Sequence, residues 1–178
     1  MKNLISILCL SLVVVLATTG CVTKRQFPKG LTAYDSGDHA TALRELTSLA
    51  KQGDAIAQFN LGLIYRKGDG VPQDYKTAVK WWKLAAEQGD AIAQNNLGLM
   101  YRKGEGVPQD EKTAVKWYRL AAEQGNANAQ TNLGVMYANG QGVPQDYKTA
   151  VKWYTLAAEQ GNAVAQYNLG LDWKKATS

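Results

Sequence analysis

Hydrophobic positions recur with a helical spacing through most of the chain. Ala57, Leu61, Ile64, Tyr65 and Gly68 follow one another at i, i+4, i+7, i+8 and i+11. This spacing places all five on one stripe of an amphipathic helix. The pattern therefore predicts a helix that buries one side against a neighbour.

A second stripe follows about twenty residues later, and it combines small residues with large rings: Ala78, Trp81, Trp82, Ala85 and Ala86. The segment KGDGVPQD, residues 67–74, separates the two stripes. Its two glycines allow positive φ angles, and Pro72 cannot extend a helix that would need its N–H. We therefore expect two helices joined by a loop, with Asp74 as the N-cap of the second helix.

The pair of stripes repeats every 36 residues. Leucines mark the register, at positions 61, 97, 133 and 169, and glycines follow each of them at positions 62, 98, 134 and 170. The full units are 54–89, 90–125 and 126–161, with a half unit at 31–53 and another at 162–178. A fixed period of this size is typical of a helical repeat array.

The unit boundaries carry their own signals. Each stripe of the first kind follows a glycine and then an Asp or Asn, and these residues are good helix N-caps: Asp54, Asp90, Asn126 and Asn162. The preceding glycines can adopt the left-handed conformation that ends a helix. A single helix pair cannot bury its apolar face, so the pairs should stack into an all-α solenoid.

The two ends depart from the repeat. The half unit 31–53 lacks the G-V-P loop, which predicts an N-terminal cap. In the last half unit, Asp172 occupies the position of Ile64, Met100 and Met136, which suits a terminal helix with a polar outer face.

The N-terminus predicts export. Met1-Lys2-Asn3 precedes an apolar run from Leu4 to Ala17 that is too short to span a bilayer as a helix. We therefore expect a signal peptide at 1–20. Thr18-Thr19-Gly20-Cys21 resembles a bacterial lipobox, although Thr18 stands where leucine is usual, so cleavage by the ordinary signal peptidase is the alternative.

Lipidation would explain the only cysteine left after cleavage, Cys21. Residues 21–30 would then form a lipidated N-terminus and a short tether, which anchors the protein to a membrane. Val22 after the cysteine resembles the pattern sorted to the outer membrane in a Gram-negative host.

The chain offers little catalytic chemistry. His39 is its only histidine, and its place before a helix favours a surface or capping role. No Cys or His cluster has metal-ligand spacing, and Gly68-Asp69-Gly70 follows a helix without a lysine-serine signature. We therefore expect no enzyme activity, no cofactor and no metal.

The net charge of +5 must be read together with export. Lysine pairs four residues apart recur on the second helix of each unit and form a basic ladder: Lys76 and Lys80, Lys112 and Lys116, Lys148 and Lys152. The ladder is either a solvated face that keeps the array soluble or a surface that attracts anionic envelope material. Nucleic acid is excluded because export removes the protein from it.

The motif A-Q-x-N-L-G-x-x-Y, then G-x-G-V-P-Q-D, then K-T-A-V-K-W-Y-x-L-A-A-E-Q-G resembles the Sel-one-like repeat family, which is related to the tetratricopeptide repeats. The resemblance covers 54–170 and, more loosely, 31–53. It implies a right-handed superhelix of antiparallel helix pairs whose first helices line a concave surface. It also implies an adaptor or scaffold.

The repeats differ from one another at positions of the first helix that lie on one face, distinct from the buried stripe. By the resemblance this is the concave face. Recognition of a partner would produce such variation, and so would neutral drift. The candidate partner-binding residues are Phe59, Leu63, Arg66, Asn95, Leu99, Arg102, Thr131, Val135, Ala138 and Tyr167.

These patterns predict an exported repeat scaffold that binds a protein or peptide in the bacterial envelope. The alternative is a peptidoglycan-acting or beta-lactam-binding protein, as the cysteine-rich members of the same family suggest. Those members carry a cysteine pair in each repeat, and residues 54–170 contain no cysteine.

Overall fold

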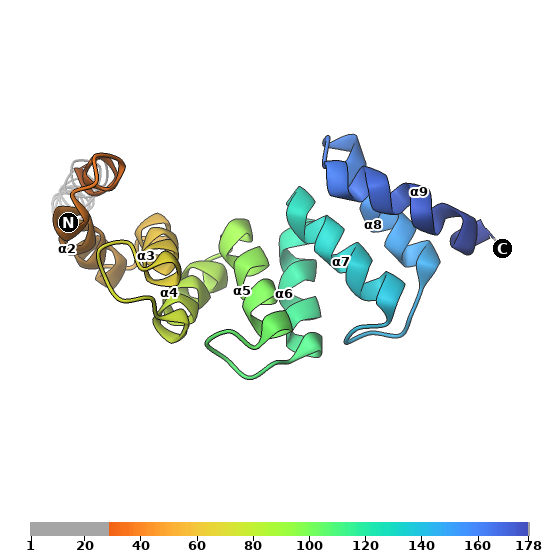
Figure 1. Ribbon diagram of the computed structural model, residues 1–178, viewed down its shortest axis with the longest axis horizontal. Helices are drawn as coiled ribbons and strands as arrows, with labels where there is room; N and C mark the ends of the chain where they lie inside the picture. The colour runs from red at the N-terminus through yellow and green to blue at the C-terminus, as the bar shows by residue number, and fades with distance from the viewer. Residues whose placement is uncertain (1–28, 178) are drawn as a thin grey trace, which may run out of the picture. The chain divides into compact units, whose positions relative to one another are not determined.

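The computed structural model describes the backbone of residues 29–177 and the side chains of residues 29–171. The predicted signal peptide, Cys21 and most of the predicted tether lie outside this range, as does the side chain of Asp172. After a short helix at 29–35, the helices are α2 (His39–Lys51), α3 (Ala55–Lys67), α4 (Tyr75–Glu87), α5 (Ala91–Lys103), α6 (Glu111–Glu123), α7 (Ala127–Asn139), α8 (Tyr147–Glu159) and α9 (Ala163–Thr177) (Figure 1).

The chain divides into two compact units, Met1–Leu61 and Gly62–Ser178, with the boundary inside α3. In the first unit a tight turn joins the helix at 29–35 to α2, and Gly37 adopts a φ of 80° there. The cap of α2 is Asp38, whose Oδ1 accepts a hydrogen bond from the backbone N of Thr41 at 3.0 Å. His39 is thus the first residue of the helix, and the capping role suggested for it belongs to its neighbour.

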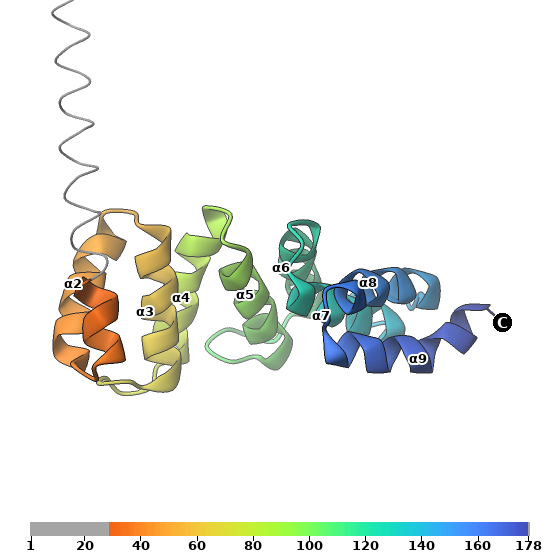
Figure 2. The same ribbon diagram turned by 90° about the horizontal axis from the view of Figure 1, so that it is seen from above.

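In the second unit each helix packs on the next one along the chain, from α4 through α9 (Figure 2). Between residues 29 and 177 the structure contains helices and no strands. This sequential stacking of helix pairs confirms the all-α solenoid.

The predicted helix boundaries are confirmed. Asp90 accepts a hydrogen bond from the backbone N of Ala93 at 2.7 Å, and Asn126 accepts one from the backbone N of Ala129 at 2.9 Å. The glycine before each cap has a positive φ, 96° at Gly89. One detail differs from the expectation, because Gly68 lies beyond the end of α3 and opens the loop instead of extending the buried stripe.

Within each of three helix pairs, a glycine of the first helix packs under an aromatic ring of the second helix. A Cβ atom added at Gly98 of α5 would lie 2.5 Å from Cδ1 of Tyr118 in α6. Trp82 covers Gly62 in the same way, so this ring fills space within a pair. The gap between the pairs α5–α6 and α7–α8 holds half-buried rings instead, including Trp153 against the α6–α7 cluster.

Candidate functional site

A groove of about 290 Å³ runs across the odd-numbered helices of the second unit. Helix α5 contributes Asn95 and Leu99, and the N-terminal halves of α7 and α9 with the residue before α9 contribute the rest of the lining: Asn128, Thr131, Asn132, Asn162 and Val164. The lining is therefore rich in side-chain amides beside a few aliphatic groups.

The asparagines link neighbouring repeats by hydrogen bonds. Nδ2 of Asn132 in α7 donates to Oδ1 of Asn95 in α5 at 2.9 Å. Nδ2 of Asn162 donates to Oδ1 of Asn128 at 3.1 Å. Each amide offers two donors and a carbonyl oxygen with two lone pairs, so these links occupy only part of its capacity. The groove can therefore present both donors and acceptors, which is what the backbone of an extended peptide needs.

The structure brings three of the predicted binding residues together in this groove: Asn95, Leu99 and Thr131. Thr131 is only 6% exposed, and its hydroxyl donates to the carbonyl oxygen of Ala127 at 2.9 Å. It therefore forms part of the groove floor, where its small size leaves room above it.

The other predicted positions lie elsewhere. Val135 and Ala138 belong to or pack against the α7–α8 core, and Ala138 is only 6% exposed. Tyr167 on α9 is 68% exposed. The remaining four are half-buried on α3 and α5 and do not line the groove: Phe59, Leu63, Arg66 and Arg102.

Sequence reasoning missed four lining residues: Asn128, Asn132, Asn162 and Val164. Asn132 has an asparagine at the equivalent place in every repeat, and a search for variable positions passes over it. Asn162 was expected only as a cap, and it serves as one by accepting from the backbone N of Ala165 at 3.0 Å. Its Nδ2 is the group that reaches the groove.

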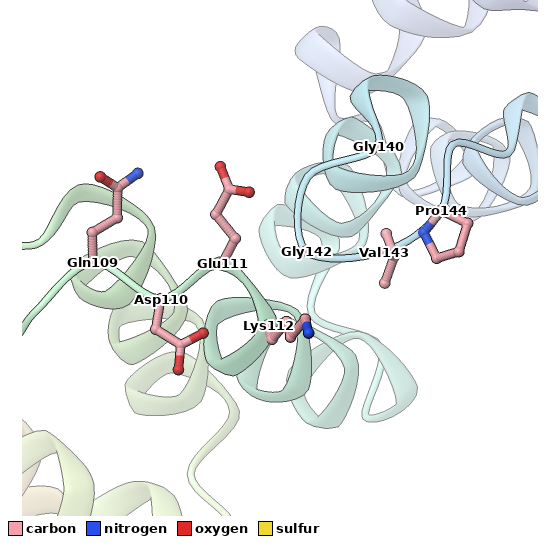
Figure 3. A pocket seen from close by; sticks show the side chains of 8 residues that line it. All are labelled: Gln109, Asp110, Glu111, Lys112, Gly140, Gly142, Val143 and Pro144. Carbon is pink, nitrogen blue, oxygen red and sulfur yellow. The ribbon is translucent and has the colours of Figure 1, made fainter.

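A second and wider cleft of about 680 Å³ lies between two successive loops and the start of α6 (Figure 3). One side is lined by Gln109, Asp110, Glu111 and Lys112, and the other by Gly140, Gly142, Val143 and Pro144. The loop approaches α6 closely, because a Cβ atom at Gly142 would lie 2.5 Å from the carbonyl carbon of Glu111.

The carboxylates of this cleft have structural tasks. Asp110 caps α6 and accepts from the hydroxyl of Thr113 at 2.6 Å, and this hydrogen bond lowers the pKa of its carboxyl group. Glu111 accepts from Nε2 of Gln141 at 3.3 Å. A general acid needs a raised pKa at neutral pH, and the lowered pKa of Asp110 is the opposite. Asp110 is therefore poorly suited to acid catalysis.

The lysines of the basic ladder are exposed on α4, α6 and α8, whereas the groove is formed by α5, α7 and α9. Among the described residues, no group of three or more His, Cys, Asp or Glu side chains is arranged to hold a metal ion. Within the same range, every helix is too short or too polar to cross a membrane.

A family model for the Sel1 repeat matches residues 55–90, 91–126, 127–162 and 163–174. The chain belongs to the Sel1 repeat family. The first three matches are full repeats shifted by one residue from the sequence register, and the fourth covers only α9. No curated protein matches the chain.

Solved structures of other Sel1 repeat proteins are similar. One is c5321, a protective antigen present in uropathogenic Escherichia coli strains, with 43% identity over 85% of this chain and a TM-score of 0.81. Another is a Sel1 repeat protein from Oxalobacter formigenes, with 41% identity over 80% of this chain and a TM-score of 0.76. This chain spans 33% of the first protein and 58% of the second.

The cysteine-rich protein B of Helicobacter pylori shares the fold alone. It is 21% identical over 74% of this chain, its own chain is covered to 95%, and the TM-score is 0.59. Sel1 repeat proteins are generally scaffolds for protein interactions and generally not enzymes.

Proposed function

We propose that this protein is an envelope scaffold that binds an extended segment of a protein partner in the asparagine-lined groove of α5, α7 and α9. The observation that carries the proposal is the pairing of Asn132 with Asn95 at the groove wall. It fixes two amides from successive repeats side by side, and fixed amides bind a peptide backbone with little loss of side-chain freedom.

Leu99 and Val164 complete the recognition surface. Val164 is 60% exposed and Leu99 is half-buried, so both can contact an apolar side chain of the ligand. Amides would then select an extended backbone, and the aliphatic groups would select its side chains. The family's general role as a scaffold supports this arrangement.

The signal peptide predicted at 1–20 supports a location in the bacterial envelope, and Cys21 is the proposed lipid attachment point. Mass spectrometry of the intact mature protein tests this part. A chain that begins at an acylated Cys21 supports the anchor, and a chain that retains residues 1–20 or begins elsewhere contradicts it.

Site-specific photocrosslinking in the producing cells tests the groove. A photoreactive amino acid at position 99 should give a discrete protein adduct. The matched control is position 120, because Leu120 is 46% exposed on α6, away from the groove lining. Identical adducts from both positions, or none from position 99, would contradict the proposal.

A further inference from the structure

Each odd-numbered helix of the second unit offers the next helix the same two features. The first is a glycine that seats a ring, as Gly134 in α7 seats Tyr154 of α8, with Cε1 of the ring 2.5 Å from a Cβ built on the glycine. The second is a buried glutamine whose Oε1 accepts a hydrogen bond. Gln130 receives it from Nε2 of Gln160 at the end of α8, at 2.8 Å.

The pair α5–α6 shows the same arrangement. Gly98 seats Tyr118, and Gln94 accepts from Nε2 of Gln124 at 2.7 Å. An aromatic ring and a glutamine six residues further on are therefore what a second helix contributes to this interface.

Helix α9 has the same features without a covering helix in the described part of the chain. A Cβ atom at Gly170 would meet nothing within 4 Å, and Gln166 is exposed where Gln130 is only 4% exposed. Nε2 of Gln166 donates to the carbonyl oxygen of Ala158 at 3.3 Å, which is the bond that Gln130 makes to Ala122. Gln166 is thus already held in the orientation of its counterparts.

An apolar neighbour of Gly170 is uncovered as well. Leu169 is half-buried, although its equivalent in α7, Leu133, is fully buried. Both views show α9 against α8 with no helix on its other side (Figures 1 and 2). The predicted polar outer face rests on Asp172, whose side chain lies outside the described range, and it stays a prediction.

We infer that α9 binds an amphipathic helix of a partner protein. The contacting residues of this partner helix resemble those that α6 and α8 present to α5 and α7. The partner helix seats an aromatic ring over Gly170 and, six residues later, donates a side-chain amide to Oε1 of Gln166. The inference rests on the α5–α6 and α7–α8 interfaces, which are formed in the same unit by the glycine and glutamine that α9 also carries. It concerns a different face from the groove and does not depend on the proposed function.

A labelled peptide with the sequence of residues 145–162, which is α8 with its caps, is the probe. Its binding to the full chain is followed by fluorescence anisotropy. We expect saturable binding that weakens at least tenfold when the peptide carries Tyr154→Ala.

On the protein, Gly170→Leu should abolish binding, because the added side chain fills the ring seat. The substitution has open space around it, so the fold should be retained, and circular dichroism verifies this. Leu120→Ala on α6 is the control and should leave binding unchanged.

Three results would overturn the inference. The first is a peptide that does not bind. The second is binding of equal strength to the Gly170→Leu protein, which indicates exchange with the resident α8. The third is self-association in sedimentation that Gly170→Leu removes, which indicates that a second copy of the chain covers α9. Crosslinking from position 99 should be unaffected by Gly170→Leu, so failure here is distinct from failure of the groove.

Discussion

Gly134 of α7 lies directly beneath the ring of Tyr154 of α8, so closely that the glycine has no room for a Cβ atom. This contact closes the helix pair of the last full repeat. Its counterparts at Gly98 and Gly62 close the pairs before it. The absence of a side chain at these positions therefore sets the distance between the two helices of each pair.

Gly134→Ala should destabilise the protein by about 1–3 kcal/mol, because the methyl group must push the ring of Tyr154 out of its seat. Chemical denaturation measures the change. Gly170→Ala is the matched control, since its methyl group meets open space and alanine is the better helix former by up to about 1 kcal/mol. An equal change in both variants would show that the contact with the ring of Tyr154 does not govern the stability at this position.

The buried glutamines connect successive helices. Gln130→Ala should cost about 1–3 kcal/mol, because it removes the acceptor for Gln160 and the donor to the carbonyl oxygen of Ala122. Thermal and chemical unfolding both report this loss. The same change at Gln166, which is exposed, should stay within about 0.5 kcal/mol. A reversed order of the two effects would contradict the interface described here.

Tyr118 is fully buried, and no partner for its hydroxyl is found among the described residues. Burial raises the pKa of Tyr118 from 10.0 to about 12. Above pH 10 the hydroxyl of Tyr118 ionises in the unfolded chain but stays neutral in the folded protein. This difference favours the unfolded state as the pH rises. Stability should fall between pH 10 and 12 by about 2–3 kcal/mol.

Tyr118→Phe should remove this alkaline loss and leave stability at pH 7 unchanged or slightly higher, because no described residue forms a hydrogen bond with the buried hydroxyl. Denaturant melts from pH 7 to 12 test both points. Tyr167→Phe, at a position 68% exposed, should behave as the unchanged protein does. A Tyr118→Phe protein that loses stability at pH 7 would indicate that the hydroxyl has a partner.

The capping aspartates of the second helices should make the fold sensitive to acid. Asp146 accepts a hydrogen bond from the hydroxyl of Thr149 at 2.6 Å, and this bond lowers the pKa of the Asp146 carboxyl below 3.8. The stabilisation is complete above pH 3.8 and is lost as the pH falls through the lowered pKa.

Asp146→Asn should therefore flatten the acid branch of the stability profile, measured by circular dichroism from pH 2 to 7. Thr149→Val is the companion variant. It keeps the carboxylate but removes the hydroxyl, and it should flatten the branch partly. An acid branch that neither substitution alters would contradict this assignment.

The sequence was sufficient for the helices, the loops and the caps because these depend on local spacing. Asp90 and Gly89 act within one turn of the chain, and their residue types reveal their roles. The stacking of pairs follows from the 36-residue period, because each unit repeats the same unpaired apolar face.

The groove was less predictable because it depends on how helices from different repeats approach one another. The bond between Asn132 and Asn95 joins residues 37 positions apart, and the geometry of α5 and α7 decides whether they meet. Thr131 and Ala138 lie on the variable face, yet packing buries both. A search for positions that vary between repeats therefore finds part of the groove. It does not find Asn132, because asparagine stands at this position in every repeat.

The most direct test of the groove compares partner capture by three purified mature proteins in a quantitative pull-down from the envelope. The groove variant is Asn95→Ala with Leu99→Ala, and the control is Leu120→Ala with Leu156→Ala, two exposed positions on α6 and α8. Matched melting temperatures confirm that all three are folded. We predict that the groove variant recovers at least tenfold less of the partner that crosslinks to position 99, while the control recovers as much as the unchanged protein. Equal recovery by the groove variant would contradict the account.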